Sequence, residues 1–139
     1  MNSTHFEIGR IMATARRKKL NSVLLIDDNE IDCFINRKIL ESVDVTDILV
    51  FESTITALEY LTQTKKIPEL ILLDINIPSM DGFKFIDEFR KLKIAQHSTD
   101  ILILSAFISP DIERIKEKCS GFIEKPLTKK KLFAELDHV

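Results

Sequence analysis

The sequence predicts an α/β fold, with one parallel sheet of five strands and helices on both of its faces. The main observation is a set of short continuous apolar runs at residues 23–26, 70–73 and 101–104. These runs lack the alternation of a half-exposed strand, which is typical of strands buried on both faces of a parallel sheet. Segments with apolar residues at helical spacing separate the runs, and such an order favours right-handed βαβ crossovers.

Two weaker strands complete the expected sheet. Residues 48–51 form an apolar stretch between two helical segments, and residues 122–123 follow Gly121 near the end of the chain. Strands and helices then alternate along the chain with connections of a few residues. We therefore expect a doubly wound (βα)5 arrangement.

Each expected helix is marked by an apolar stripe. Local caps agree with this pattern, because Ser53 and Thr128 stand at helix starts and residues 109–111 (SPD) combine an N-cap with a proline in the first turn. The five stripes are Ile31, Phe34, Ile35 and Ile39; Thr54, Ala57, Leu58 and Leu61; Phe85, Ile86, Phe89 and Leu92; Ile112, Ile115 and Cys119; and Leu132, Phe133 and Leu136.

Length and composition restrict the possible partners. A chain of 139 residues is expected to form one domain. Its 20 Lys and Arg residues against 22 Asp and Glu residues give no basic footprint for nucleic acid, and no apolar run approaches the roughly 20 residues of a membrane helix. Cys33 and Cys119 form no CxxC pair, so we expect small buried side chains in helices and a reducing, cytoplasmic compartment.

Residues 1–20 differ in character from the rest of the chain. They combine a few apolar side chains at weakly helical spacing with a basic run at residues 16–19, which we interpret as a solvated charge cluster. We expect residues 1–20 to be an extension that is disordered or forms a short helix. Residues 21–139 are expected to form the folded domain.

Polar residues stand directly at the ends of the expected strands. Asp27 and Asp28 follow the first strand, Asp74 ends the third, Ser105 ends the fourth and Lys125 follows the fifth. Because parallel strands point the same way, these side chains should meet at the carboxyl edge, where open α/β sheets bind ligands. Taken singly, each has an ordinary explanation as a helix cap or a turn residue. Their occurrence at successive strand ends favours a binding site.

The residue types at this edge indicate a chemistry. Three carboxylates in one crevice repel each other, so the site requires positive charge. Lys125 supplies one charge, and a divalent cation would supply the rest. Oxygen ligands without a nearby His or Cys favour a hard ion such as Mg²⁺. A cation, a lysine and a hydroxyl facing a carboxylate suit phosphoryl transfer, for which an aspartate is a known acceptor.

Four motifs, in this order, resemble the receiver domains of two-component response regulators. They are residues 24–30 (LLIDDNE), 72–82 (LLDINIPSMDG), 104–106 (LSA) and 121–127 (GFIEKPL), and the resemblance covers about residues 20–139. It implies a flavodoxin-like sheet with strand order 2-1-3-4-5. It also implies a stand-alone, single-domain regulator and a cis bond before Pro126.

The resemblance implies roles for the acids at the sheet edge. Asp74 would be the phosphoacceptor. Mg²⁺ would be coordinated by the carboxylates of Asp28 and Asp74, by the backbone carbonyl of Asn76, and by Asp27 largely through metal-bound water. The resemblance thus implies one phosphoacceptor and one Mg²⁺ site at the same edge of the sheet.

The resemblance also implies how the phosphoryl group is held and sensed. Lys125 would pair with the phosphoryl group, Ser105 would donate a hydrogen bond to one of its oxygens, and Phe122 would be the aromatic switch that rotates with Ser105. Three departures from the family pattern occur. The spacing from Ser105 to Lys125 is slightly shorter than usual, Phe122 replaces the Tyr that often stands there, and Phe107 stands near the site where smaller or polar residues are common.

The function implied is a phosphorylation-activated signalling switch. A histidine kinase or a histidine phosphotransfer protein would donate the phosphoryl group, and the signal would leave by protein contact or by onward phosphorelay. The contact surface would be formed by the fourth helix, the fifth strand and the fifth helix. No enzymatic activity is expected beyond self-catalysed phosphorylation and dephosphorylation of the aspartate.

Three other functions fit parts of the pattern. A haloacid-dehalogenase-like phosphatase would carry its nucleophile after the first strand in a DxD arrangement, whereas Asp27 and Asp28 are adjacent. A flavin-binding module would need a Ser-, Thr- or Gly-rich loop there to cradle a phosphate, and residues 28–30 would repel one. A degenerate receiver that only binds proteins would not need the complete set of site residues. Steady turnover, bound flavin or failure to take phosphate would identify each in turn.

Overall fold

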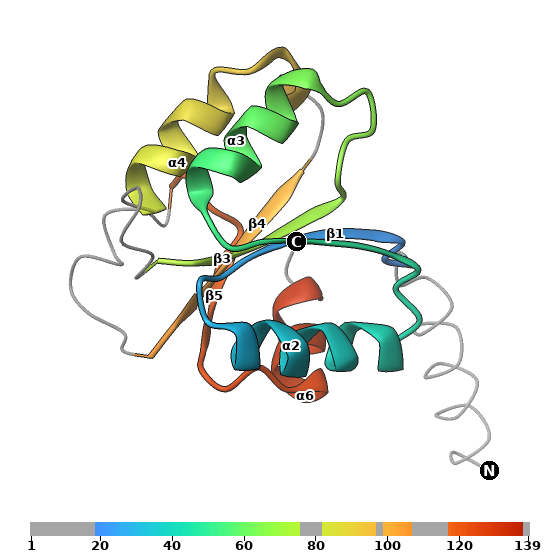
Figure 1. Cartoon of the computed structure of the whole chain (residues 1–139). Helices are drawn as coiled ribbons and strands as arrows, with labels where there is room; N and C mark the ends of the chain where they lie inside the picture. Colours follow the sequence, from blue (N-terminus) through green and yellow to red (C-terminus); the bar gives the residue numbers. More distant parts are fainter. Residues whose placement is uncertain (1–18, 76–81, 97–98, 107–116, 138–139) are drawn as a thin grey trace, which may run out of the picture.

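The computed structural model describes residues 19–75, 82–96, 99–106 and 117–137 (Figure 1). Some expectations from the sequence lie outside these ranges. They are the fourth helix with its cap at residues 109–111, the ligand role of Asn76 and the character of residues 1–18. These stay predictions.

A parallel sheet forms the centre of the fold, in the order β2-β1-β3-β4-β5. Every neighbouring pair of strands is parallel, which confirms the predicted architecture and strand order. The strands are β1 (Ser22–Ile26), β2 (Asp47–Phe51), β3 (Leu70–Asp74), β4 (Asp100–Ser105) and β5 (Gly121–Glu124). The helices of the described residues are α2 (Glu30–Ser42), α3 (Thr54–Gln63), α4 (Gly82–Arg90) and α6 (Lys129–Leu136), with a 3-10 turn, η1 (Lys93–Gln96).

The helices cover the sheet from both sides, with α3 and α4 on one face and α2 and α6 on the other (Figure 1). An apolar cluster fills each interface. Leu24 and Ile26 of β1 belong to the cluster under α3 and α4, whereas Val23 and Leu25 belong to the cluster under α2 and α6. Successive residues of the strand therefore point to opposite faces, and all four are buried. This burial on two sides is the reason for the continuous apolar runs in the sequence.

Polar caps fix where the helices begin. Ser53 caps α3 and Thr128 caps α6, each by accepting hydrogen bonds from N–H groups of the first turn, as predicted. Asn29 caps α2 in the same way, with its side-chain oxygen 2.9 Å from the N–H nitrogen of Asp32. Because the first N–H groups of a helix have no partner within it, such caps stabilise helix starts directly after the strands. None of the helices in the described ranges combines the length and the apolar character that crossing a bilayer requires.

Most of the apolar stripe that marks α2 in the sequence lies outside the core. Ile31, Phe34 and Ile35 are 70%, 64% and 47% exposed, and of the predicted stripe Ile39 packs on the core. The physical reason is that the buried face of α2 includes a polar residue, Asn36. Apolar spacing alone therefore favoured the neighbouring face of the helix. The residues that α2 buries are Cys33, Asn36 and Leu40.

The two cysteines lie in different settings. Cys33 is buried in α2, as predicted, and both thiols are free. Cys119 is partly buried in the turn before β5, so its predicted place in a helix was wrong. The N–H of Ser120 donates to the carbonyl oxygen of Ile101 at 2.8 Å. The chain has therefore joined the sheet one residue after Cys119, which leaves no room for a helical turn there.

The exposure of α2 leads to a stability prediction. Phe34→Ala should change the free energy of unfolding by less than about 0.5 kcal/mol, because its ring faces solvent. Leu40→Ala should lower it by about 2–5 kcal/mol, because the side chain is fully buried. Urea unfolding of both variants measures the two values. Similar losses in both would mean that Phe34 belongs to the core.

Candidate functional site

Three carboxylates converge at the carboxyl edge of the sheet. Asp27 and Asp28 follow β1, and Asp74 is the last residue of β3, the strand next to β1. One carboxylate oxygen of each residue lies within 4.8 Å of the others. Asp27 and Asp74 are buried, whereas Asp28 is exposed. The sheet thus brings together the three acids that stand at its strand ends.

Backbone and side-chain hydrogen bonds fix Asp27 in place. Its N–H donates to the carbonyl oxygen of Phe51 in β2 (3.0 Å), and its Oδ1 accepts from the N–H of Asn29 (3.0 Å). The thiol of Cys33 donates to its carbonyl oxygen at 3.2 Å. Its second carboxylate oxygen, Oδ2, is buried and has no hydrogen-bond partner among the described residues. Among those residues its ion-pair partner is the ammonium group of Lys125, 3.6 Å away, which is too long for a hydrogen bond.

The buried position of Asp27 changes its charge behaviour. Burial raises the pKa of its carboxyl from 3.8 to about 6, and the charge of Asp74 acts in the same direction. The N–H of Asn29 and the ammonium group of Lys125 favour the carboxylate and limit this rise. Above pH 6 the site therefore holds a carboxylate in surroundings that disfavour its charge.

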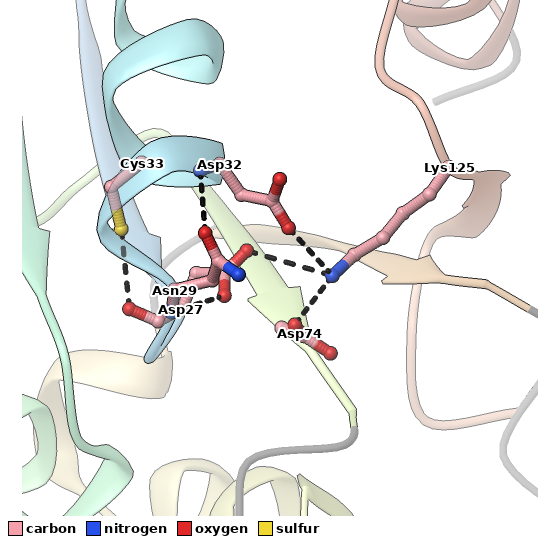
Figure 2. A network of polar contacts seen from close by, with 6 residues as sticks. All are labelled: Asp27, Asn29, Asp32, Cys33, Asp74 and Lys125. Atoms are coloured by element: carbon pink, nitrogen blue, oxygen red, sulfur yellow. Dashed lines mark hydrogen bonds and ion pairs between the residues drawn. The ribbon is translucent and has the colours of Figure 1, made fainter.

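Lys125 brings a positive charge into the acid cluster from the end of β5 (Figure 2). Its Nζ lies 2.6 Å from Oδ2 of Asp74, 3.6 Å from Oδ2 of Asp27 and 3.5 Å from Oδ2 of Asp32. The short contact is a charge-assisted hydrogen bond, and the two longer contacts are ion pairs. The pKa of Lys125 is raised: burial acts to lower it, but the hydrogen bond and the charge of Asp74, with the charges of Asp27 and Asp32, outweigh burial.

Neighbouring elements fix the turn that carries Lys125. Its N–H donates to the carbonyl oxygen of Ser105 at 2.8 Å, and the peptide bond between Lys125 and Pro126 is cis, as predicted. Lys131 of α6 donates from its ammonium group to the carbonyl oxygens of Glu124 (2.9 Å) and Pro126 (3.1 Å). These contacts, which the sequence did not indicate, hold both sides of the lysine position.

Ser105 and Phe122 lie on the two strands beyond Asp74. Ser105 ends β4, the neighbour of β3, and is buried. Phe122 lies on β5 opposite Ile103 of β4. Its ring is partly buried and packs against the apolar cluster under α3 and α4. The hydroxyl and the aromatic ring are therefore carried by adjacent strands, one next to the acid cluster and one a strand further away.

Asp32 is a residue near the site that the sequence analysis missed. It lies in the first turn of α2, and 93 positions separate it from Lys125 along the chain. Its N–H bonds the side chain of Asn29, so the spacing of these two residues indicates a helix cap and nothing further. No local motif links residues so far apart. The folded chain was needed to reveal this contact.

The donor set at the site consists of carboxylate oxygens. The thiol of Cys33 lies beside Asp27 and is a potential soft ligand. Burial raises its pKa to about 11, and the charge of Asp27 adds to the effect. Its sulfur therefore stays protonated at neutral pH and donates to a backbone oxygen. A hard cation matches the remaining ligands better than a soft metal does.

Comparison with known proteins identifies the family. The chain matches the response regulator receiver domain over residues 23–137. It is 35% identical to the sensor histidine kinase CheAY of Helicobacter pylori, over 75% of this chain and 13% of that protein. It is 28% identical to the polar-differentiation response regulator DivK of Brucella ovis, over 77% of this chain and 85% of that protein. The chain thus spans a small part of the first relative and most of the second.

Solved structures agree with this match. A two-component response regulator from Cytophaga hutchinsonii superposes with a TM-score of 0.75 at 29% identity, covering 86% of this chain and 96% of that one. A two-component response regulator from Legionella pneumophila gives 0.72 at 27% identity, covering 86% and 99%. The Vibrio cholerae chemotaxis protein CheY4, at 24% identity and a TM-score of 0.74, shares the fold. This chain therefore belongs to the receiver domain family of two-component response regulators, whose general function is a phosphorylation-based switch.

Proposed function

We propose that Asp74 accepts a phosphoryl group from a histidine kinase or a histidine phosphotransfer protein, and that the chain thereby acts as a signalling switch. One observation carries this assignment. Among the converging acids, Asp74 makes the 2.6 Å hydrogen bond to Lys125, whereas Asp27 lies 3.6 Å from the same nitrogen. A phosphatase that used the acid after the first strand would favour the reverse arrangement.

In the proposed reaction a carboxylate oxygen of Asp74 attacks the phosphorus atom of a phosphohistidine. An O–P bond forms while the P–N bond breaks, and the histidine nitrogen leaves with the electron pair. Negative charge grows on the phosphoryl oxygens next to Lys125. Because that ammonium group is already held beside Asp74, it stabilises this charge without a large rearrangement.

Mg²⁺ fits the acid cluster as the proposed cation. The ligands would be the carboxylates of Asp28 and Asp74, with Asp27 acting through metal-bound water; Asn76, the fourth proposed ligand, lies outside the described residues. Oδ2 of Asp27, which lacks a hydrogen bond among the described residues, and the all-carboxylate donor set of the cluster support this fit. When bound, the ion would neutralise the acids and the incoming phosphoryl charge.

The phosphoryl donor must cover the rim of the acid cluster, because its histidine has to reach Asp74. The exposed side chains of Ile31, Phe34 and Ile35 lie on α2, the helix that begins two residues after Asp28. Exposed apolar patches of this kind are typical of protein contact sites. This surface supports a protein as the donor, and the name of the CheAY relative includes a histidine kinase.

The output of the proposed switch depends on Ser105 and Phe122. A phosphoryl group on Asp74 adds negative charge and acceptor oxygens at the sheet edge. Ser105 would move to donate to one of these oxygens, and the ring of Phe122 would turn into the space that this movement opens. Of the proposed contact surface, β5 and α6 lie within the described residues. A partner that prefers the shifted state would then bind more tightly after phosphorylation.

Asp74→Asn should abolish phosphorylation. Incubation with acetyl phosphate and Mg²⁺ should add one hydroxylamine-sensitive phosphoryl group to the parent chain, because acyl phosphates react with that nucleophile. Asp47→Asn, which removes an exposed acid from the start of β2, is the matched control and should be labelled like the parent. Intact-mass spectrometry measures the label. Full labelling of Asp74→Asn would assign the phosphoryl group to another residue.

The raised pKa of Asp27 predicts a pH-dependent stability of the metal-free chain. The folded chain favours the protonated form of Asp27. The contribution of this group to the free energy of unfolding is therefore fully present below its unfolded pKa and is lost as pH rises through about 6. Asp27→Asn removes this loss. Between pH 4 and pH 7.5 its stability should rise relative to the parent by about 1–3 kcal/mol, measured by urea unfolding in chelator. Parallel pH profiles for the two chains would contradict the prediction.

Ser105→Ala should separate phosphorylation from its readout. In the parent, the phosphoryl mimic beryllofluoride with Mg²⁺ should shift amide NMR signals from Asp74 through Ser105 to Phe122 and α6. In the variant the signals near Asp74 should still shift, whereas those of Phe122 and α6 should stay in place. Asp74→Asn, which cannot hold the mimic, is the negative control. Shifts that never reach Phe122 in the parent would leave a simple phosphate carrier as the better account.

A further inference from the structure

We propose that Asp32 is a positioning residue for phosphoryl transfer, which holds the ammonium group of Lys125 on the open side of the acid cluster. This inference rests on the proposed role of Asp74. It assigns a function to an acid that lies outside the four sequence motifs. Asp32 is also not one of the three acids whose carboxylate oxygens converge.

The contacts of Lys125 come from two directions. Asp74 and Asp27 lie on the inner side, and their side chains are 5% and 0% exposed. The side chain of Asp32 is 39% exposed and lies 3.5 Å from the ammonium nitrogen. Figure 2 shows its carboxylate pointing at Lys125 from α2, while Asp74 approaches from β3. The lysine therefore lies between buried acids and a partly exposed one.

The first turn of α2 places Asp32 for this contact. Its N–H is held by the side chain of Asn29, 2.9 Å away, so the position of the residue is fixed by the helix cap. An acid in a first helical turn also interacts favourably with the helix dipole. That general effect applies equally to Glu30, which shares the turn. It does not require a carboxylate that points at a lysine from another element.

These contacts determine the position of the Lys125 ammonium group before phosphoryl transfer. With its two inner partners alone, Lys125 would be drawn toward Asp27 and Asp74 and away from the entrance. Asp32 attracts it toward solvent, the side from which a phosphoryl group arrives. If Asp27, Asp28 and Asp74 coordinated a cation, Asp32 would still be available as an ion-pair partner for Lys125. The charge that meets the phosphoryl oxygens is then in position before the reaction begins.

The rate of phosphorylation by acetyl phosphate distinguishes this role from simple electrostatics. Removing a negative charge near the entrance should speed the approach of an anionic donor. Loss of positioning should instead slow the reaction. We expect Asp32→Asn to lower the rate constant about three- to tenfold in saturating Mg²⁺, the size of effect that a partly exposed ion pair and a misplaced group allow. Asp32→Glu should recover part of the rate.

Glu30→Gln is the matched control, because it removes the same charge from the same helical turn. Its rate constant should equal or slightly exceed that of the parent. An unchanged or faster Asp32→Asn would overturn the proposal, and so would equal slowing in Glu30→Gln, which would indicate an effect on the helix start. Thermal unfolding of each variant checks that the fold is kept.

A second measurement separates this inference from the proposed function. The side-chain NMR signals of Lys125 should shift in Asp32→Asn and stay unchanged in Glu30→Gln, without any phosphoryl donor. If the parent chain takes no phosphate on Asp74, the proposed function fails, whereas a shifted lysine signal still supports the contact. If the parent is phosphorylated but neither rate nor signal responds to Asp32→Asn, the proposed function stands and the role of Asp32 is refuted.

Discussion

The charge balance between two buried carboxylates and one lysine is the constraint on which the rest of the site depends. Asp27, directly after β1, and Asp74, at the end of the adjacent β3, have almost no contact with water, so each increases the free-energy cost of the other's charge. Lys125, 2.6 Å from Asp74, offsets part of that cost. An anion that attracts Lys125, or a cation that binds the acids, therefore changes the electrostatic surroundings of both carboxylates at once.

The sheet tolerates this cluster because its other residues are apolar and its register is fixed by backbone bonds. β1 and β3 are buried on both faces below the acids, and that burial supplies the favourable free energy of folding. The N–H of Asp27 bonds Phe51 of β2, and the N–H of Lys125 bonds Ser105. Both bonds continue the strand ladders past the strand ends. The polar residues are thus placed by the backbone contacts that align the strands, even where their charges are unfavourable.

The same distinction explains what could be predicted from the sequence. Strands buried on both faces form continuous apolar runs, so the sheet and the edge at which its acids meet could be inferred from local patterns. The core face of α2 could not, because Asn36 occupies a buried position and Phe34 an exposed one. Asp32 was missed because its contact with Lys125 joins distant segments. Local spacing records which residues share an element, but it does not record which charges meet between elements.

Helix α2 contributes less to the core than its apolar content suggests, and more to the site. It buries a small residue, Cys33, whose thiol donates to the backbone carbonyl of Asp27. Its large apolar side chains face solvent instead, a cost that a partner would remove on binding. The first turn also carries Asp32 to Lys125. In the proposed function, a donor that covers the exposed face of α2 would therefore touch the helix that helps to hold the lysine, so docking and charge placement would act through one element.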